Sequence, residues 1–277
     1  MSATDAVPSL QTLRLALEGA VLHVVLNRPE KANAINAPMW QELRTAMDWL
    51  DRTDAARVGV LSAAGTRFCA GLDLAMFGQL QAGTEDACPG RSREHLRRHI
   101  LDIQDTVSSI ERCRKPVIAA VHGACVGGGV DIITACDMRY CSEEAWFSVK
   151  EIDVGLVADV GTLQRLPRIV GEGHARELAF TGRRVDAREA AQMRLVNRCY
   201  DTNDELRKRV AELAEGLVAK SPLSLRGTKE MINYARDHTV ADSLNHVATW
   251  NAAMLFSLDL DEARAAAREG RPASYRD

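Results

Sequence analysis

The sequence lacks paired cysteines, long apolar runs and a surplus of either charge. Its seven cysteines form no Cys-x-x-Cys pair and accompany no histidine cluster, which argues against a disulfide framework and against a metal site. No stretch approaches the roughly 20 apolar residues that span a bilayer, so we expect no membrane partner. The net charge of -3 offers no general attraction to nucleic acid, and we expect no nucleic-acid partner.

Both ends of the chain lack a recognisable targeting signal. The N-terminal segment MSATDAVPSLQTL has neither the basic start and apolar run of a secretory signal nor the arginine-rich character of a transit peptide. The C-terminal SYRD does not match a peroxisomal address. We therefore predict a cytoplasmic location.

Strand and helix patterns alternate over residues 1–205. LRLALEGAVLHVVLNRP places two apolar runs around Glu18 and Gly19, which predicts a hairpin, and VGVLSA predicts a short buried strand. The segment after Pro38 repeats apolar residues at helical spacing. Residues 79–92 are polar and contain glycine, which is typical of a mobile surface excursion. The alternation predicts an α/β core in a first domain, 1–205.

Residues 206–277 are almost wholly helical in pattern. The chain from DELRKRVAELAEGLVAK to LDEARAAAREG contains four helical segments, each with an apolar stripe. We predict that this second domain packs on its own core or on a neighbouring subunit.

A glycine triplet at Gly127, Gly128 and Gly129 opens an apolar helical stretch. The first N–H groups of a helix have no intrahelical partner and carry the positive end of its dipole, so the turn can receive an oxyanion. The same glycines could instead serve only a tight strand-to-helix turn. Both interpretations stay open at this point.

Three acidic side chains follow the triplet. Asp131 sits in the first turn of an apolar helix, where it either interacts with the helix dipole or is a buried carboxylate available for catalysis. Glu151 and Asp159 flank an apolar loop, and Asp159 could instead cap the following helix. We interpret Lys150 and Asp153 as solvated charges, His122 as a lone core or loop histidine, and Cys125 and Cys136 as packing residues.

The run KPVIAAVHGACVGGGVDIITACDMRYCSEEAWFSVKEIDVGLVADVGTLQRLPRIVG resembles the signature of the crotonase (enoyl-CoA hydratase/isomerase) superfamily. Within it the sequence is most similar to the Δ3,5-Δ2,4-dienoyl-CoA isomerases. In these an aspartate follows the glycine triplet, a glutamate lies twenty positions on, and another aspartate lies eight beyond that; Asp131, Glu151 and Asp159 match all three. The motifs RPEKANAIN and FCAGLDL extend the resemblance over nearly the whole chain.

The resemblance implies an α/β fold, a crotonase-like spiral of ββα units with a C-terminal helical trimerisation region, assembled as a homotrimer or a hexamer of two trimers. It implies an acyl-CoA thioester substrate in fatty-acid β-oxidation, with no metal and no cofactor beyond the coenzyme A of the substrate. The implied oxyanion hole uses the N–H groups of Leu72 and Gly128. The implied coenzyme A contacts, largely through main chain, are Lys31, Ala32, Asn33, Ala34, Ala70, Gly71, Leu72, Asp73, Leu74 and Gly128.

In the implied mechanism Glu151 and Asp159 shuttle a proton along the acyl chain, and Asp131 orients or tunes them. Enoyl-CoA hydratases generally have two glutamates at the positions of Asp131 and Glu151, and usually a glycine at that of Asp159. An enoyl-CoA hydratase or a Δ3-Δ2-enoyl-CoA isomerase is therefore the closest alternative. A crotonase-fold binding protein without turnover, such as an RNA binder, is the alternative of another class.

Overall fold

A computed structural model describes residues 6–277, except the side chains of residues 77, 79–81 and 84. Its main sheet has the strand order β1-β2-β3-β4-β6-β9. The β1–β2 hairpin is antiparallel and turns where the sequence predicts, with Glu18 paired to Val21; the other strand pairs are parallel. The strands are β1 (Leu13–Glu18), β2 (Val21–Leu26), β3 (Val58–Ala63), β4 (Val117–Val121), β6 (Met138–Ser142) and β9 (Arg198–Tyr200).

A second, three-stranded sheet forms where the chain turns out of the first. Its strands are β5 (Ala124–Val126), β7 (Trp146–Ser148) and β8 (Val185–Asp186). Gly123 makes the turn from β4 into β5 with φ +58°, and a Cβ at this position would lie 2.1 Å from the carbonyl oxygen of Thr66. Only glycine fits both the left-handed backbone and this contact. β4, β5 and the helix that follows form one of the expected ββα units.

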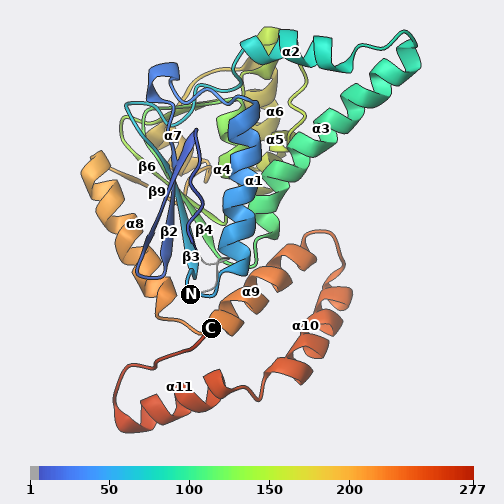
Figure 1. Cartoon of the computed structure of the whole chain (residues 1–277). Coiled ribbons are helices and arrows are strands. Elements are labelled where there is room, and N and C mark those ends of the chain that lie inside the picture. The colour runs from blue at the N-terminus through green and yellow to red at the C-terminus, as the bar shows by residue number, and fades with distance from the viewer. Residues whose placement is uncertain (1–5) are drawn as a thin grey trace.

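Helices cover both faces of the main sheet, as Figure 1 shows. On one face, alternate residues Val58 and Val60 of β3 pack against α8, whereas Leu61 belongs to the larger core on the other face, as the two-residue period of a strand requires. The helices of the body are α1 (Ala37–Arg52), α2 (Ala75–Thr84), α3 (Pro89–Arg112), α4 (Gly128–Ala135), α5 (Thr162–Val170), α6 (Glu172–Thr181), α7 (Ala187–Gln192) and α8 (Asn203–Val218), with 3-10 turns η1 (Pro29–Lys31) and η2 (Glu151–Val154).

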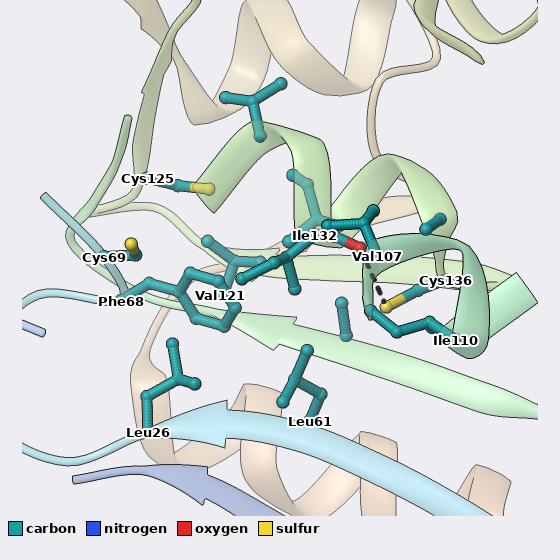
Figure 2. Close-up of a cluster of buried hydrophobic side chains, with 14 of the residues drawn as sticks. Leu26, Leu61, Phe68, Cys69, Val107, Ile110, Val121, Cys125, Ile132 and Cys136 are labelled. Atoms are coloured by element: carbon teal, nitrogen blue, oxygen red, sulfur yellow. Dashed lines mark hydrogen bonds between the residues drawn. The ribbon is translucent and has the colours of Figure 1, made fainter. Parts of the chain in front are cut away.

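The larger core supports α4. Figure 2 shows Leu26 and Leu61 of the sheet below Phe68 and Val121, with Ile132 of α4 above them. All five side chains are fully buried. The helix that follows the glycine triplet is therefore held on a rigid platform.

Residues 79–92, for which the sequence predicts a mobile surface excursion, lie at the surface but are mostly helical. These residues complete α2 and begin α3, separated by a short connection. The segment contains good helix formers, and Pro89 occupies the first position of α3, where its missing N–H costs no hydrogen bond. A polar composition did not distinguish an exposed helix from a loop.

Three helices at the C-terminus extend away from the body (Figure 1): α9 (Pro222–Ala235), α10 (Val240–Met254) and α11 (Leu258–Glu269). We call residues 222–270 the C-terminal arm. The division of the chain into domains 1–205 and 206–277 stays a prediction, although α8, just beyond that boundary, packs on the main sheet.

The arm joins the body through α9. The Lys229 side chain is 7% exposed, and its ammonium group donates to Asp137 at 2.8 Å and to the carbonyl oxygen of Lys115 at 3.1 Å. Further along the arm, α10 contains no buried residue. Among residues 6–277, no helix combines the length and apolar character that crossing a membrane requires.

Candidate active site

Two glycine turns meet at the N-terminus of α4. The chain before Gly71 runs beside β5, since the Cys69 N–H donates to the Ala124 oxygen at 2.8 Å and Cys69 accepts from the Val126 N–H at 2.9 Å. A Cβ on Gly71 would lie 3.3 Å from the Val126 oxygen, and one on Gly127 would lie 3.8 Å from the Gly71 Cα. The two turns are therefore in direct contact.

The amides of Leu72 and Gly128 follow these turns by one residue each. Gly128 is the first residue of α4, so its N–H has no acceptor within the helix and lies at the positive end of the dipole. Between residues 6 and 277 we find no hydrogen-bond acceptor for either amide. Two such donors on adjoining turns fit an anionic oxygen.

The glycine triplet also has a packing role. A Cβ on Gly128 would lie 2.9 Å from the Ile35 Cδ1 atom, and one on Gly129 would lie 2.9 Å from the Cys69 Cβ. Both are too close for carbon atoms. The two interpretations of the triplet are therefore compatible, because the same residues give close packing and exposed amides.

Asp131 is almost completely buried, at 2% exposure. Its Oδ1 accepts the N–H of Thr162, the first residue of α5, at 2.7 Å. Burial raises the pKa of the Asp131 carboxyl to about 6, and the Thr162 hydrogen bond opposes that rise. Asp131 thus caps the following helix, which neither of the two sequence interpretations foresaw.

Glu151 lies against the glycine turn. Its Oε1 is 3.1 Å from the position of a Cβ on Gly127. Its Oε2 is buried and, in the described part of the chain, has no hydrogen-bond partner. Burial first, and then the nearby charge of Asp131, raise the pKa of the Glu151 carboxyl to about 7. An acid in this state can release and take up a proton near neutral pH.

Asp159 is exposed, and its carbonyl oxygen accepts from the Gln104 side-chain amide at 2.6 Å. Partial burial raises the pKa of its carboxyl. Its charge in turn raises the pKa values of Asp131 and Glu151, so all three acids are close enough to interact. The alternative of Asp159 as the cap of α5 is wrong, because Asp131 takes that place.

The two segments expected to line coenzyme A lie side by side. The Ala70 N–H donates to the Ala32 oxygen at 3.0 Å, and Ile35 exchanges backbone hydrogen bonds with Gly71 and Asp73. The Ala34 oxygen accepts from the Arg28 guanidinium at 2.5 Å. These hydrogen bonds join the two segments to each other and to the turn that carries the Leu72 amide.

The side chains of these two segments differ in whether they are free to contact a substrate. Asn33 is fully buried and donates to the carbonyl oxygens of Ala64 and Arg67, both at 2.8 Å. Asp73 forms an ion pair with Arg28 at 3.2 Å. Leu74 is 68% exposed. Asn33 and Asp73 are thus committed to internal contacts, consistent with a substrate site made largely of main chain.

The residues that the sequence analysis excluded from catalysis make ordinary structural contacts. His122 contacts the Gly65 oxygen at 2.9 Å. Burial raises the pKa of the Cys125 thiol well above its usual range and that of Cys136 to about 12. Lys150 and Asp153 form a surface ion pair. Over residues 6–277, no cluster of three or more His, Cys, Asp or Glu side chains is arranged to hold a metal ion.

Arg165 is a charged neighbour of the site that the sequence did not reveal. Its side chain is only 12% exposed, and its charge acts on Asp131. An arginine in the first turns of an amphipathic helix is normally read as solvated, so no pattern in the sequence marked it.

Known proteins resemble this chain along almost its whole length. A family model described as enoyl-CoA hydratase/isomerase matches residues 16–277. The peroxisomal Delta(3,5)-Delta(2,4)-dienoyl-CoA isomerase of Arabidopsis thaliana is 46% identical over 260 residues, 94% of either chain. The mitochondrial Delta(3,5)-Delta(2,4)-dienoyl-CoA isomerase of Homo sapiens is 45% identical over 95% of this chain and 81% of its own. Among solved structures, an enoyl-CoA hydratase from Bacillus anthracis superposes with a TM-score of 0.86 at 29% identity, covering 96% of this chain and 99% of its own.

The predicted cytoplasmic location is wrong, since the similar isomerases are named as peroxisomal and mitochondrial proteins. The prediction rested on missing targeting signals, and a missing signal gives no positive information about a compartment. The first five residues of the segment searched for a signal also lie outside the described residues.

Proposed function

The chain belongs to the enoyl-CoA hydratase/isomerase family, and we propose that within it the chain converts 3,5-dienoyl-CoA into 2,4-dienoyl-CoA in fatty-acid β-oxidation. The observation that carries the proposal is the group of three interacting acids, Asp131, Glu151 and Asp159, beside the glycine turn. Relatives bearing the name dienoyl-CoA isomerase at 45–46% identity support the same conclusion.

In this proposal the thioester carbonyl oxygen lies between the N–H groups of Leu72 and Gly128. Proton removal next to the carbonyl places negative charge on that oxygen. Fixed donors stabilise it, and each is typically worth about 10²–10³ in rate.

Glu151 takes the proton from carbon 2. Its Oε1 packs against Gly127, one residue from the Gly128 amide, so it lies nearest the carbon next to the carbonyl. The electron pair spreads over the conjugated chain, and Asp159 returns a proton to carbon 6. One proton leaves and one enters, the two double bonds shift by one carbon each, and the balance needs no redox group or metal.

The surroundings of Glu151 and Asp159 suit their roles as the base and the acid. Near neutral pH a carboxyl with a pKa of about 7, as in Glu151, has both forms populated. Asp159 is exposed in the free protein; a bound acyl chain excludes water from it and favours its protonated form. Asp131 keeps a fixed position through Thr162 and tunes its neighbours by its charge.

Substrate preference tests the activity. We expect the purified protein to convert 3,5-dienoyl-CoA into the conjugated 2,4-dienoyl product, followed by ultraviolet absorbance, much faster than it hydrates 2-enoyl-CoA. Faster hydration, with no dienoyl product, would assign the chain to the hydratases instead. RNA binding with steep salt dependence and no turnover would favour the binding-protein alternative.

Asp159→Asn tests the shuttle, with Asp153→Asn as the matched control. Both residues are exposed acids between β7 and α5, but Asp153 pairs with Lys150. We expect Asp159→Asn to lower kcat about 10²-fold or more without changing the unfolding temperature, and Asp153→Asn to retain activity. Near-normal turnover of Asp159→Asn would remove Asp159 from the mechanism.

We also propose that the chain assembles as a trimer or as a hexamer of two trimers. The C-terminal arm and its linkers expose large apolar side chains, among them Val240 (77%), Leu244 (63%), Phe256 (90%) and Leu258 (84%). Apolar surface of this kind favours burial in an interface. Sedimentation velocity should give a trimer or hexamer, and Phe256→Asp should shift the distribution to smaller species; a monomer at micromolar concentration would contradict the proposal.

A further inference from the structure

A polar cavity of about 780 Å³ lies between the body and the C-terminal arm. Asp159 and Gly161 line it on the side of the active site, and Asn233 of α9 and Arg236, which follows α9, line it on the side of the arm. Arg165 lies in the same wall. The cavity therefore has Asp159 and the arm on its two sides, with the largely buried Arg165 in its wall.

Arg165 is held tightly in this wall. Its Nη2 donates to the Glu111 Oε2 at 3.0 Å and to the Ser108 Oγ at 3.1 Å. Its guanidinium packs against Gly161, where a Cβ would lie 1.8 Å from Nη1. Gly161 directly precedes Thr162, whose N–H holds the Asp131 carboxylate. The positive charge is thus fixed beside the turn that positions Asp131.

Glu111 connects this cation to the arm. Its Oε2 accepts from Arg165, and its Oε1 pairs with Arg236, the residue that follows α9. Its carbonyl oxygen also accepts from the Asn233 side-chain amide at 3.2 Å. One carboxylate of α3 is therefore shared between an arginine next to the active site and an arginine of the arm.

We infer that Arg165 is a positioning residue for isomerisation, which holds a buried positive charge beside Asp131, and that Glu111 ties this charge to the C-terminal arm. The inference rests on the proposed function, since the charge of Asp131 has to be controlled only if the three acids transfer protons. Arg165 acts through Asp131 and does not touch the acyl chain.

The physical reason is the crowding of like charges. The charged groups facing Asp131 are Glu151 of η2, Asp159 of the following loop and Arg165 of α5, and behind Arg165 stand Glu111 and Arg236. Asp159 disfavours ionisation of Asp131, and both aspartates disfavour ionisation of Glu151. Arg165 opposes this crowding, because its charge lowers the pKa of the Asp131 carboxyl. Without this cation Asp131 holds its proton to higher pH, so the ionised Asp131 that isomerisation needs in this inference forms only at a higher pH.

The test compares Arg165→Gln with Arg165→Lys, using Arg168→Gln as the matched control. Arg168 also lies on α5 and also links it to the arm region, through Asp237 at 3.2 Å, but both partners are more than half exposed. We expect Arg165→Gln to lower kcat at pH 7 roughly 3- to 10-fold and to move the acidic limb of the kcat profile upward by about half to one pH unit. KM should change less than about twofold, Arg165→Lys should restore most of the loss, and Arg168→Gln should match the unmodified protein.

Arg236→Gln provides a second test that leaves Arg165 in place. It removes the ion pair between Glu111 and the arm, so we expect a smaller shift of the acidic limb in the same direction. If Arg165→Gln does not fold, this variant tests the inference in its place. A fall in kcat that is equal at every pH, or a profile unchanged in both variants, would overturn the inference. If Asp159→Asn abolishes turnover while these profiles stay unchanged, this inference alone fails; if Asp159→Asn retains turnover, the proposed function fails.

Discussion

Removing the buried acid at position 151 should stabilise the protein while it abolishes catalysis. Glu151 lies in a site that raises the pKa of its carboxyl from the ordinary 4.5 to about 7, and its Oε2 has no hydrogen-bond partner in the described part of the chain. The folded state therefore binds this proton more tightly than the unfolded state. The contribution of this proton to the free energy of unfolding is complete below pH 4.5 and is lost as the pH rises through 7.

The size of the effect follows from this difference in pKa. Each pH unit is worth about 1.4 kcal/mol, so ionised Glu151 lowers the free energy of unfolding by about 3 kcal/mol above pH 7. At pH 5.5 the same difference gives only about 1 kcal/mol. Glu151→Gln has nearly the same shape and no charge. We expect it to be more stable than the unmodified protein by these amounts, with coupling to Asp131 reducing them.

Thermal unfolding at pH 5.5 and pH 8.5, at one protein concentration, measures this difference. About 3 kcal/mol corresponds to roughly 6–12 °C for a chain of this size. The exposed Glu144, in the turn between β6 and β7, provides the control, and Glu144→Gln should change little at either pH. A Glu151→Gln variant that is no more stable at pH 8.5, or whose gain does not grow between the two pH values, would refute the reasoning.

Three other substitutions test the surrounding structure. Lys229→Met removes the cation paired with the partly exposed Asp137 and the donor to the carbonyl oxygens of Ile110 and Lys115; it should cost about 1–3 kcal/mol, measured as a lower urea midpoint. Gly129→Ala places a Cβ 2.9 Å from that of Cys69 and should cost about 1–3 kcal/mol, measured in the same way. Asn33→Ala leaves two carbonyl oxygens without their donor, so we expect a higher KM for the acyl-CoA, measured by initial rates, and about 1–3 kcal/mol lower stability.

Regular patterns allowed the sequence to predict much of the fold. The hairpin at Glu18, the strand VGVLSA and the amphipathic helix after Pro38 all form as expected, because their apolar spacing matches the period of the element. The sequence does not show that the chain leaves the main sheet at Gly123 and begins a second sheet there. That turn depends on a contact with Thr66, which lies far away in the chain.

The candidate site was predictable as a set of residues but not as an arrangement. The motif resemblance pointed to Asp131, Glu151 and Asp159. It could not show that Asp131 caps α5 or that Arg165 is buried beside it. Both features come from packing between segments about thirty residues or more apart, and a linear pattern does not contain that information.

Hydrogen bonding separates the roles of Asp131 and Glu151, the two less exposed acids of the site. Asp131 is 2% exposed, yet its pKa rises only to about 6, because the Thr162 amide stabilises the ionised form. The pKa of Glu151 reaches about 7 although Glu151 is less deeply buried, and its Oε2 has no partner in the described part of the chain. A donor aimed at Oε2 would lower that pKa and weaken the base just where it must accept a proton from carbon. The unpaired oxygen is therefore the property that suits Glu151 to proton transfer, whereas the paired Asp131 is suited to holding a fixed charge.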